Sequence, residues 1–214
     1  ALGETVAARL KGRTVMGNVR VGLSEDVAVS ALPAALGRLR RACPQVHLEV
    51  VVDHGDALAE RWNDGELDVA IGVSSAFNAD PVHAWNVELY WVCAIDDEVD
   101  PALPLDVIVY AEPCAWRRLM FDALLNAGRD FRVTVTSPNV GVITAAVEGG
   151  LGVALLPAEN IRPQSMRIIS LAESGGPVLS VNYGLFAVPR QSDSVRTAVE
   201  LLTESFHAMT QPLR

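Results

Sequence analysis

The sequence contains little cysteine and no long apolar run. Its three cysteines, Cys43, Cys93 and Cys114, form no CxxC pair, and its four histidines are scattered, so neither a disulfide framework nor a zinc site is predicted. No apolar run approaches the ~20 residues of a membrane span. The first residues also lack the order of charged, apolar and small residues typical of a signal peptide. We therefore expect a cytoplasmic protein that binds no metal and no membrane.

Positive charge is scarce as well. The 17 Lys and Arg residues stand against 26 Asp and Glu residues, which gives a net charge of −9. Nucleic-acid surfaces require clustered Lys and Arg, so we expect no DNA contact from this chain. GxSxG, Walker and GxGxxG motifs are missing, and the glycines at 149, 150 and 152 follow a predicted helix rather than a strand. No catalytic constellation or cofactor site is predicted, and we expect that the chain is not an enzyme.

Half of the 214 residues are apolar, which is enough for one α/β core or two small lobes. Apolar periodicity predicts strands at 19–23, 48–52 and 69–73, with helices at 27–42 and 56–63 between them. This alternation is typical of βαβ units in a parallel sheet.

The pattern restarts after a long apolar stretch at 85–95 and an acidic turn at 96–101. The second set comprises strands at 107–110, 132–136 and 152–156, helices at 115–126 and 139–148, strands at 168–171 and 181–188, and a closing helix at 195–209. A strand and a helix follow the second lobe, and we expect them to complete the first lobe. The chain would then cross between the lobes twice. The predicted divisions are the end of a helix at 1–12, lobe I at 13–93 plus 189–214, and lobe II at 94–188.

Five short motifs occur in order along the chain. They are Val19-Arg20-Val21-Gly22, Leu32-Pro33, Pro44, Gly65-Glu66-Leu67-Asp68-Val69-Ala70-Ile71-Gly72 and Val147-Glu148-Gly149-Gly150-Leu151-Gly152-Val153-Ala154-Leu155-Leu156-Pro157. In order and spacing the chain resembles the effector-binding domain of LysR-type transcriptional regulators from about residue 18 to 210. The resemblance implies a two-lobe, periplasmic-binding-protein-like (type II) α/β fold. Each lobe would be a mainly parallel sheet flanked by helices, and two crossover hinges would join the lobes.

The resemblance also implies a function. The chain would be the regulatory domain of a regulator whose N-terminal winged helix-turn-helix and linker helix are absent here, apart from a helical stub at 1–12. A small-molecule effector would bind in the cleft between the lobes, and DNA would be bound only through the missing domain. Homo-oligomers, dimers or tetramers, would form through helices, for which 32–43 and 116–125 are candidates.

In parallel α/β sheets, ligands lie beyond the carboxyl ends of the strands. This rule selects the candidate effector-binding residues Ser24, Glu25, Asp26, Gly55, Asp56, Val73, Glu112, Pro113, Cys114, Ser137 and Asn139. Carboxylate-binding members of the family tend to carry Ser or Thr at the positions of Asp26 and Asp56, and some carry Arg at that of Val73. Two acids in one cleft would repel a dicarboxylate, so a neutral, hydroxylated or amine-bearing effector is favoured.

Simpler interpretations remain open for these residues. Asp26, Asp56 and Ser137 would serve equally well as helix N-caps, and Pro113 and Pro138 as first-turn prolines. Cys114 at a helix start could act as a redox switch or be an ordinary small residue. The rival functions are a solute-binding protein of a transporter, which has the same fold, and a two-lobe enzyme using acids such as Glu25 and Glu112.

Overall fold

The computed structural model describes residues 15–30, 32–170 and 179–207, so the predicted helical stub at 1–12 lies outside the described residues. The chain forms two compact units, unit 1 (Ala1–Asn86 with Asn182–Pro212) and unit 2 (Val87–Val181). Strands β4 (His83–Ala94) and β9 (Leu179–Ala187) each contain residues of both units, so the chain passes from one unit to the other within strands. The expected boundaries after residues 93 and 188 stay predictions.

Unit 1 is built on three parallel strands and one antiparallel strand. β1 (Met16–Ser24) pairs in parallel with β2 (Gln45–Asp53) and with β3 (Val69–Val73), and β9 runs antiparallel to β3. The predicted parallel βαβ arrangement is therefore confirmed for the first three strands. The antiparallel β9 adds a late segment of the chain to the sheet of unit 1, next to β3.

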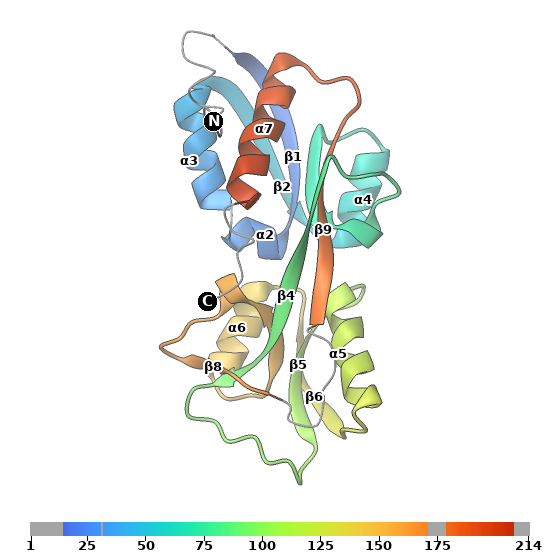
Figure 1. The fold of residues 1–214 in the computed structure, drawn as a ribbon, viewed down its shortest axis with the longest axis vertical. Helices are drawn as coiled ribbons and strands as arrows, with labels where there is room; N and C mark the ends of the chain where they lie inside the picture. The colour runs from blue at the N-terminus through green and yellow to red at the C-terminus, as the bar shows by residue number, and fades with distance from the viewer. Residues whose placement is uncertain (1–14, 31, 171–178, 208–214) are drawn as a thin grey trace, which may run out of the picture. The chain divides into compact units, whose positions relative to one another are not determined.

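Helices cover both faces of this sheet (Figure 1). A Cβ atom added at Gly17 would lie 3.1 Å from Ser194 in α7 (Asp193–His207), whereas one added at Gly22 would lie 2.8 Å from Leu58 in α4 (Gly55–Asn63). Odd and even residues of a strand face opposite sides, so α7 and α4 cover opposite faces of β1. The absence of a side chain at Gly22 is what lets α4 pack this closely.

Helical residues occupy almost all of the range 27–42 that was expected to be one helix. They are α2 (Glu25–Ser30) and α3 (Leu32–Ala42). Residue 31 lies outside the described residues, so a single continuous helix stays a prediction.

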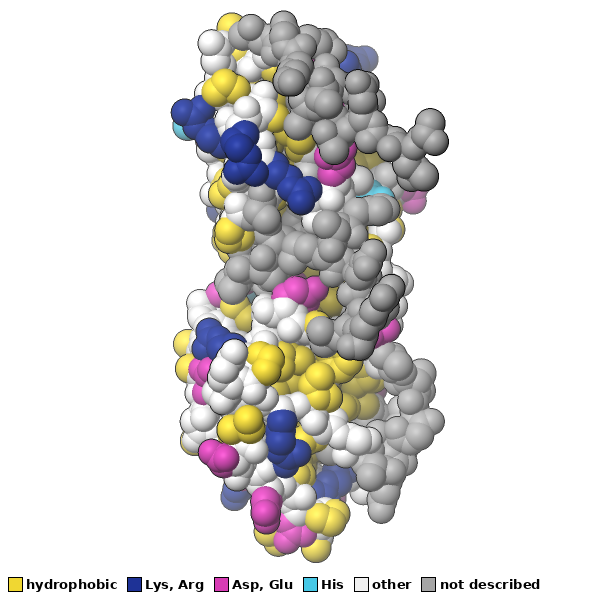
Figure 2. Space-filling model, turned by 60° about the vertical axis from the view of Figure 1, so that its left-hand side comes forward, with side chains coloured by type: hydrophobic (Ala, Val, Ile, Leu, Met, Phe, Trp, Pro, Cys, Tyr) yellow, Lys and Arg dark blue, Asp and Glu magenta, His cyan; other side chains and the backbone are white. Residues whose placement is uncertain are grey.

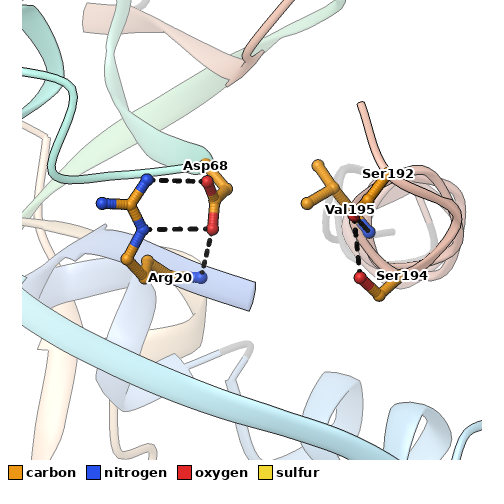
Figure 3. Close-up of polar contacts among 5 residues, drawn as sticks. All are labelled: Arg20, Asp68, Ser192, Ser194 and Val195. Carbon is orange, nitrogen blue, oxygen red and sulfur yellow. Dashed lines mark hydrogen bonds and ion pairs between the residues drawn. The ribbon is translucent and has the colours of Figure 1, made fainter. Parts of the chain in front are cut away.

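An ion pair links Arg20 in β1 to Asp68, the residue that precedes β3 (Figure 3). Arg20 donates from Nη2 to Asp68 Oδ1 at 2.8 Å and from Nε to Oδ2 at 3.3 Å, and the Arg20 backbone N–H also donates to Oδ2. These contacts lower the pKa of Asp68, chiefly through the guanidinium hydrogen bonds. The same figure shows Ser192, whose hydroxyl accepts from the Val195 N–H at the start of α7.

Unit 2 repeats the strand-helix plan. Its elements are β5 (Leu105–Tyr110), α5 (Ala115–Asn126), β6 (Phe131–Ser137), α6 (Val140–Glu148), β7 (Ala154–Pro157) and β8 (Met166–Ile168). β5 and β6 pair in parallel, while β7 and β8 run antiparallel to β4. Ile108, Ile143 and Leu156 are central to its buried core. Short 3-10 turns follow β3 at Ser74–Ala76 and β7 at Ala158–Asn160.

Glycine ends α4 and α6. Gly65 has φ +73° and Gly150 has φ +70°, which is the left-handed region that glycine adopts readily. After α4, the N–H groups of Gly65 and Glu66 donate to the carbonyls of Trp62 and Arg61, which is the Schellman pattern. These glycines stop helices and place the following strands.

Candidate functional site

Polar side chains gather in unit 1 where the parallel strands end. Ser24 is the last residue of β1 and is buried, and Glu25 and Asp26 open α2. Leu23 lies opposite Ile71 in the register of β1 and β3. Ser24 therefore lies beside Gly72, and a Cβ atom placed on Gly72 would be 3.7 Å from that of Ser24.

The carboxylate of Asp26 accepts a hydrogen bond from a residue distant in sequence. Tyr183 Oη donates to Asp26 Oδ2 at 2.5 Å, and Tyr183 itself is buried in β9 opposite Val73. The ring of Trp85 stacks on that of Tyr183 with centroids 6.0 Å apart. Tyr183 is thus held by strand pairing and by an aromatic neighbour, and it positions the Asp26 carboxylate.

Burial is the largest influence on Asp26. The residue as a whole is half-buried, but its carboxyl group is removed from solvent. This desolvation raises the pKa of Asp26 because it disfavours the charged form. Hydrogen bonds from the Tyr183 and Ser24 hydroxyls and from the N–H groups of Asp26 and Val27 lower the pKa, but by less than burial raises it. Asp26 is therefore more easily protonated than an ordinary surface aspartate.

Two serine hydroxyls of unit 1, those of Ser24 and Ser74, are shielded from solvent. The Ser24 hydroxyl lies at Asp26 and lowers the pKa of that residue. The Ser74 hydroxyl, directly after β3, makes no hydrogen bond to the described residues. We call Ser24, Asp26 and Tyr183 the unit 1 cluster.

The other unit 1 candidates lie at the start of α4. His54 is the N-cap of this helix, and Asp56 is the second helical residue and is exposed. The alternative interpretation of Asp56 as an N-cap is therefore wrong, because the helix begins one residue before it. A Cβ atom on Gly55 would lie 3.4 Å from the Cβ atom of Ala76. The start of α4 is therefore close to the 3-10 turn Ser74–Ala76 that follows β3.

Unit 2 places its candidates at the carboxyl ends of β5 and β6. The Ala111 N–H donates to the Ser137 carbonyl at 3.0 Å, which joins the two strand ends. Arg117 donates from Nη1 to the Tyr110 carbonyl, and its Nε lies 3.3 Å from Glu112 Oε1. The exposed Glu112 is thus paired within unit 2.

The caps of the unit 2 helices differ from expectation. Asn139, not Ser137, is the N-cap of α6, because its Oδ1 accepts from the Val142 N–H at 3.1 Å. Ser137 is buried and accepts from the Asn139 N–H instead. Cys114 is the N-cap residue of α5 and makes no side-chain capping bond. Pro113 and Pro138 therefore precede their caps and do not lie in first turns.

The described residues contain neither a membrane-spanning helix nor a group of metal-binding side chains. Within residues 15–30, 32–170 and 179–207, every helix is too short or too polar to cross a membrane. In that same part of the chain, no three His, Cys, Asp or Glu side chains are grouped as metal ligands.

The sequence missed one member of the unit 1 cluster, Tyr183. It gave no signal, because β9 is antiparallel to β3 and Tyr183 lies in the middle of β9 rather than at a strand end.

Comparison with known families decides the class of this chain. The model of the LysR substrate binding domain matches residues 12–208. The chain belongs to the LysR substrate-binding domain family. The motifs at 19–22, 65–72 and 147–157 therefore indicated the correct family, and the matched proteins are transcriptional regulators rather than enzymes.

This chain spans about two thirds of the length of the transcriptional regulators that it matches. The regulator PecT of Dickeya dadantii is 23% identical over 202 residues, which cover 94% of this chain and 64% of PecT. The uncharacterised regulator YusT of Bacillus subtilis is 25% identical, over 96% of this chain and 70% of YusT. The regulatory domain of HypT from Salmonella typhimurium superposes with a TM-score of 0.75 at 16% identity, covering 92% of this chain and 99% of that domain. This likeness confirms the predicted two-lobe α/β fold class.

Proposed function

We propose that this chain is the effector-sensing domain of a LysR-type transcriptional regulator. In this proposal a small molecule binds at the carboxyl ends of the strands, and the bound state is passed to an N-terminal winged helix-turn-helix domain. A regulator of this kind acts where the DNA is, so the proposed location is the cytoplasm. The observation that carries the proposal is the unit 1 cluster, which adds buried polar groups to the strand ends of a substrate-binding fold.

The proposed effector is neutral, hydroxylated or amine-bearing. Asp26 supplies a carboxylate, and the Tyr183 and Ser24 hydroxyls lie beside it, so the unit 1 cluster contributes one negative charge to the candidate site. A carboxylate on the ligand would be repelled by Asp26 and would be poorly solvated there. The charge of the cluster therefore supports the preference inferred from the sequence.

We also propose a homo-oligomer, dimer or tetramer, with contacts made by α3 and α5. Figure 2 shows Lys and Arg side chains gathered on one face of unit 1, where α3 contributes the exposed Arg38, Arg40 and Arg41. On α5, Leu125 is 68% exposed, so its side chain is accessible to a second copy of the chain. Analytical ultracentrifugation of Leu125→Glu, with Leu103→Glu in a loop as control, tests this contact by mass.

The binding proposal is tested by capture and localisation. The purified domain is incubated with fractions of a bacterial metabolite extract, adducts are weighed by native mass spectrometry, and amide hydrogen exchange then locates the captured molecule. We expect one adduct and slowed exchange at residues 24–26 and 74. Slowing at 112–114 and 137–139 as well would support the prediction that both sets of loops touch the effector. No adduct from any fraction, or protection confined to other residues, would contradict the proposal.

A further inference from the structure

We propose that two copies of this chain associate through opposite charges, with the exposed arginines of α3 in one copy facing an acidic surface of unit 2 in the other. The arginine face consists of three exposed residues, Arg38, Arg40 and Arg41. The acidic end of unit 2 consists of four exposed residues, Asp96, Glu98, Asp100 and Asp130. This inference rests on the proposed homo-oligomer and names the charged groups that stabilise it.

The arginine face lies on a helix that contains no acid (Figure 2). Arg40 donates to the Pro44 carbonyl at 2.8 Å, and Arg41 Nη1 lies 3.3 Å from the place of a Cβ atom added at Gly37. Among the described residues, the arginines that form ion pairs all lie outside α3. Like charges one turn apart on a helix, such as Arg38 and Arg41, repel each other. An acidic surface opposite them would therefore be stabilising.

The acidic end is formed by the loop between β4 and β5 and by the residue before β6. Arg129 donates from Nη2 to the Asp100 carbonyl at 2.7 Å, and the first N–H of β5 donates to the Asp130 carbonyl at 2.8 Å, so Asp100 and Asp130 lie in one region. Arg129 and Arg167 both bond to backbone carbonyls of this loop. Within the described residues, none of the four carboxylates takes part in an ion pair, so they are available to a cation of another molecule.

The charge distribution favours a second copy of the chain as the partner. Unit 2 has twelve Asp and Glu residues against six Lys and Arg residues, and the whole chain has a net charge of −9. Two such chains repel each other unless their contact brings opposite charges together. The arginine face supplies the positive side of such a contact. In a symmetric dimer each copy offers both surfaces, so the contact forms twice.

The acidic end also adjoins the helix already proposed as a contact. Asp130 is the fourth residue after the end of α5 at Asn126, and Leu125 in the last turn of that helix is exposed. The charge contact is thus continuous with the proposed contact between α3 and α5. Charged pairs at the edge of an apolar contact steer association and fix its register.

The test exchanges the charges of the two surfaces. One variant carries Arg38→Glu with Arg41→Glu, the other carries Asp100→Arg with Asp130→Arg, and analytical ultracentrifugation measures each alone and both in an equimolar mixture. Alone, each variant should self-associate about tenfold or more weakly than the wild type, because like charges then face each other. In the mixture, opposite charges meet at both contacts, so the two variants should form a mixed dimer with an affinity close to that of the wild type.

Matched controls make the same change in net charge elsewhere on the surface. They replace exposed residues of unit 1, as Arg190→Glu with Arg196→Glu and as Glu60→Arg with Asp80→Arg. Neither control should weaken association tenfold. Self-association of the wild type should also weaken several-fold between about 50 and about 500 mM NaCl, because salt screens exposed charges.

Failure of the charge pairing can be told apart from failure of the proposed oligomer. If Leu125→Glu abolishes association while both charge-reversed variants associate like the wild type, the homo-oligomer stands and the charge pairing is wrong. Reversed variants that stay apart when mixed, or controls that weaken association equally, would also overturn the pairing. A wild type that is monomeric at every concentration would contradict the homo-oligomer itself and this inference with it.

Discussion

Tyr183 donates a 2.5 Å hydrogen bond to Asp26 across 157 residues of sequence. The bond joins the first turn of α2 to β9, the strand by which the chain returns to unit 1. It gives a desolvated carboxylate its donor at the place where the parallel strands end. We expect the stability of unit 1 to depend on this contact.

The pH dependence of stability should follow Asp26. Because the pKa of Asp26 is raised in the folded domain, the folded state binds more protons than the unfolded state between the two pKa values. Its stabilising contribution is therefore full below the unfolded pKa and is lost as pH rises through the folded pKa. Asp26→Asn should be more stable than the wild type above that interval, and the difference should shrink towards acid. Urea denaturation across pH measures this, and Asp56→Asn should show no such trend.

Tyr183→Phe should destabilise unit 1 at neutral pH by about 1–3 kcal/mol, because the buried carboxylate loses a donor. The pKa of Asp26 should rise further, so the cost should be smaller in acid. Chemical denaturation of the variant at two pH values checks both parts. Tyr90→Phe, which removes a 2.7 Å bond to Glu88 in unit 2, is the control, and an equal pH trend in both variants would disprove the role of Tyr183.

Ser74→Ala should leave the free domain as stable as the wild type or raise the free energy of unfolding by up to about 1 kcal/mol. The reason is that it removes a buried hydroxyl that has no hydrogen bond to the described residues. Ser205→Ala removes a hydroxyl that donates to the Leu201 carbonyl at 2.8 Å and should lower the free energy of unfolding by about 0.5–1.5 kcal/mol. Thermal and urea denaturation compare the two variants. Losses of the same size in both would show that the Ser74 hydroxyl is satisfied in the free protein.

Gly152→Ala should be strongly destabilising in unit 2. Gly152 has φ +138°, and an added Cβ atom would lie 2.4 Å from the Asp106 carbonyl oxygen, so the variant combines backbone strain with a clash. We expect a loss of more than about 2 kcal/mol. Gly65→Ala, where φ is +73° and the space is open, should cost only about 1–2 kcal/mol. Equal losses in denaturation experiments would refute the close approach.

Local sequence patterns predicted most of the strands and helices. Apolar runs such as 69–73 and the glycines after α4 and α6 depend only on nearby residues, so they could be identified directly.

The site was harder to predict because it depends on pairing. Ser24 and Asp26 were found because strand ends are marked in the sequence, but Tyr183 enters through an antiparallel partner 157 residues away. Asp56 has the right chemistry for a cap but lies two positions after the N-cap residue, which is His54. A shift of one or two residues is within the uncertainty of helix ends, yet it decides which side chain caps.

Calorimetric titration of the captured effector into the wild type, Asp26→Asn and Asp56→Asn tests the central claim most directly. If the unit 1 cluster senses the effector through its carboxylate, Asp26→Asn should weaken binding about tenfold or more, which corresponds to ~1.4 kcal/mol. Asp56→Asn should bind like the wild type, because Asp56 is exposed at the start of α4. Equal affinity of the wild type and Asp26→Asn would contradict the account and leave Asp26 a structural residue only.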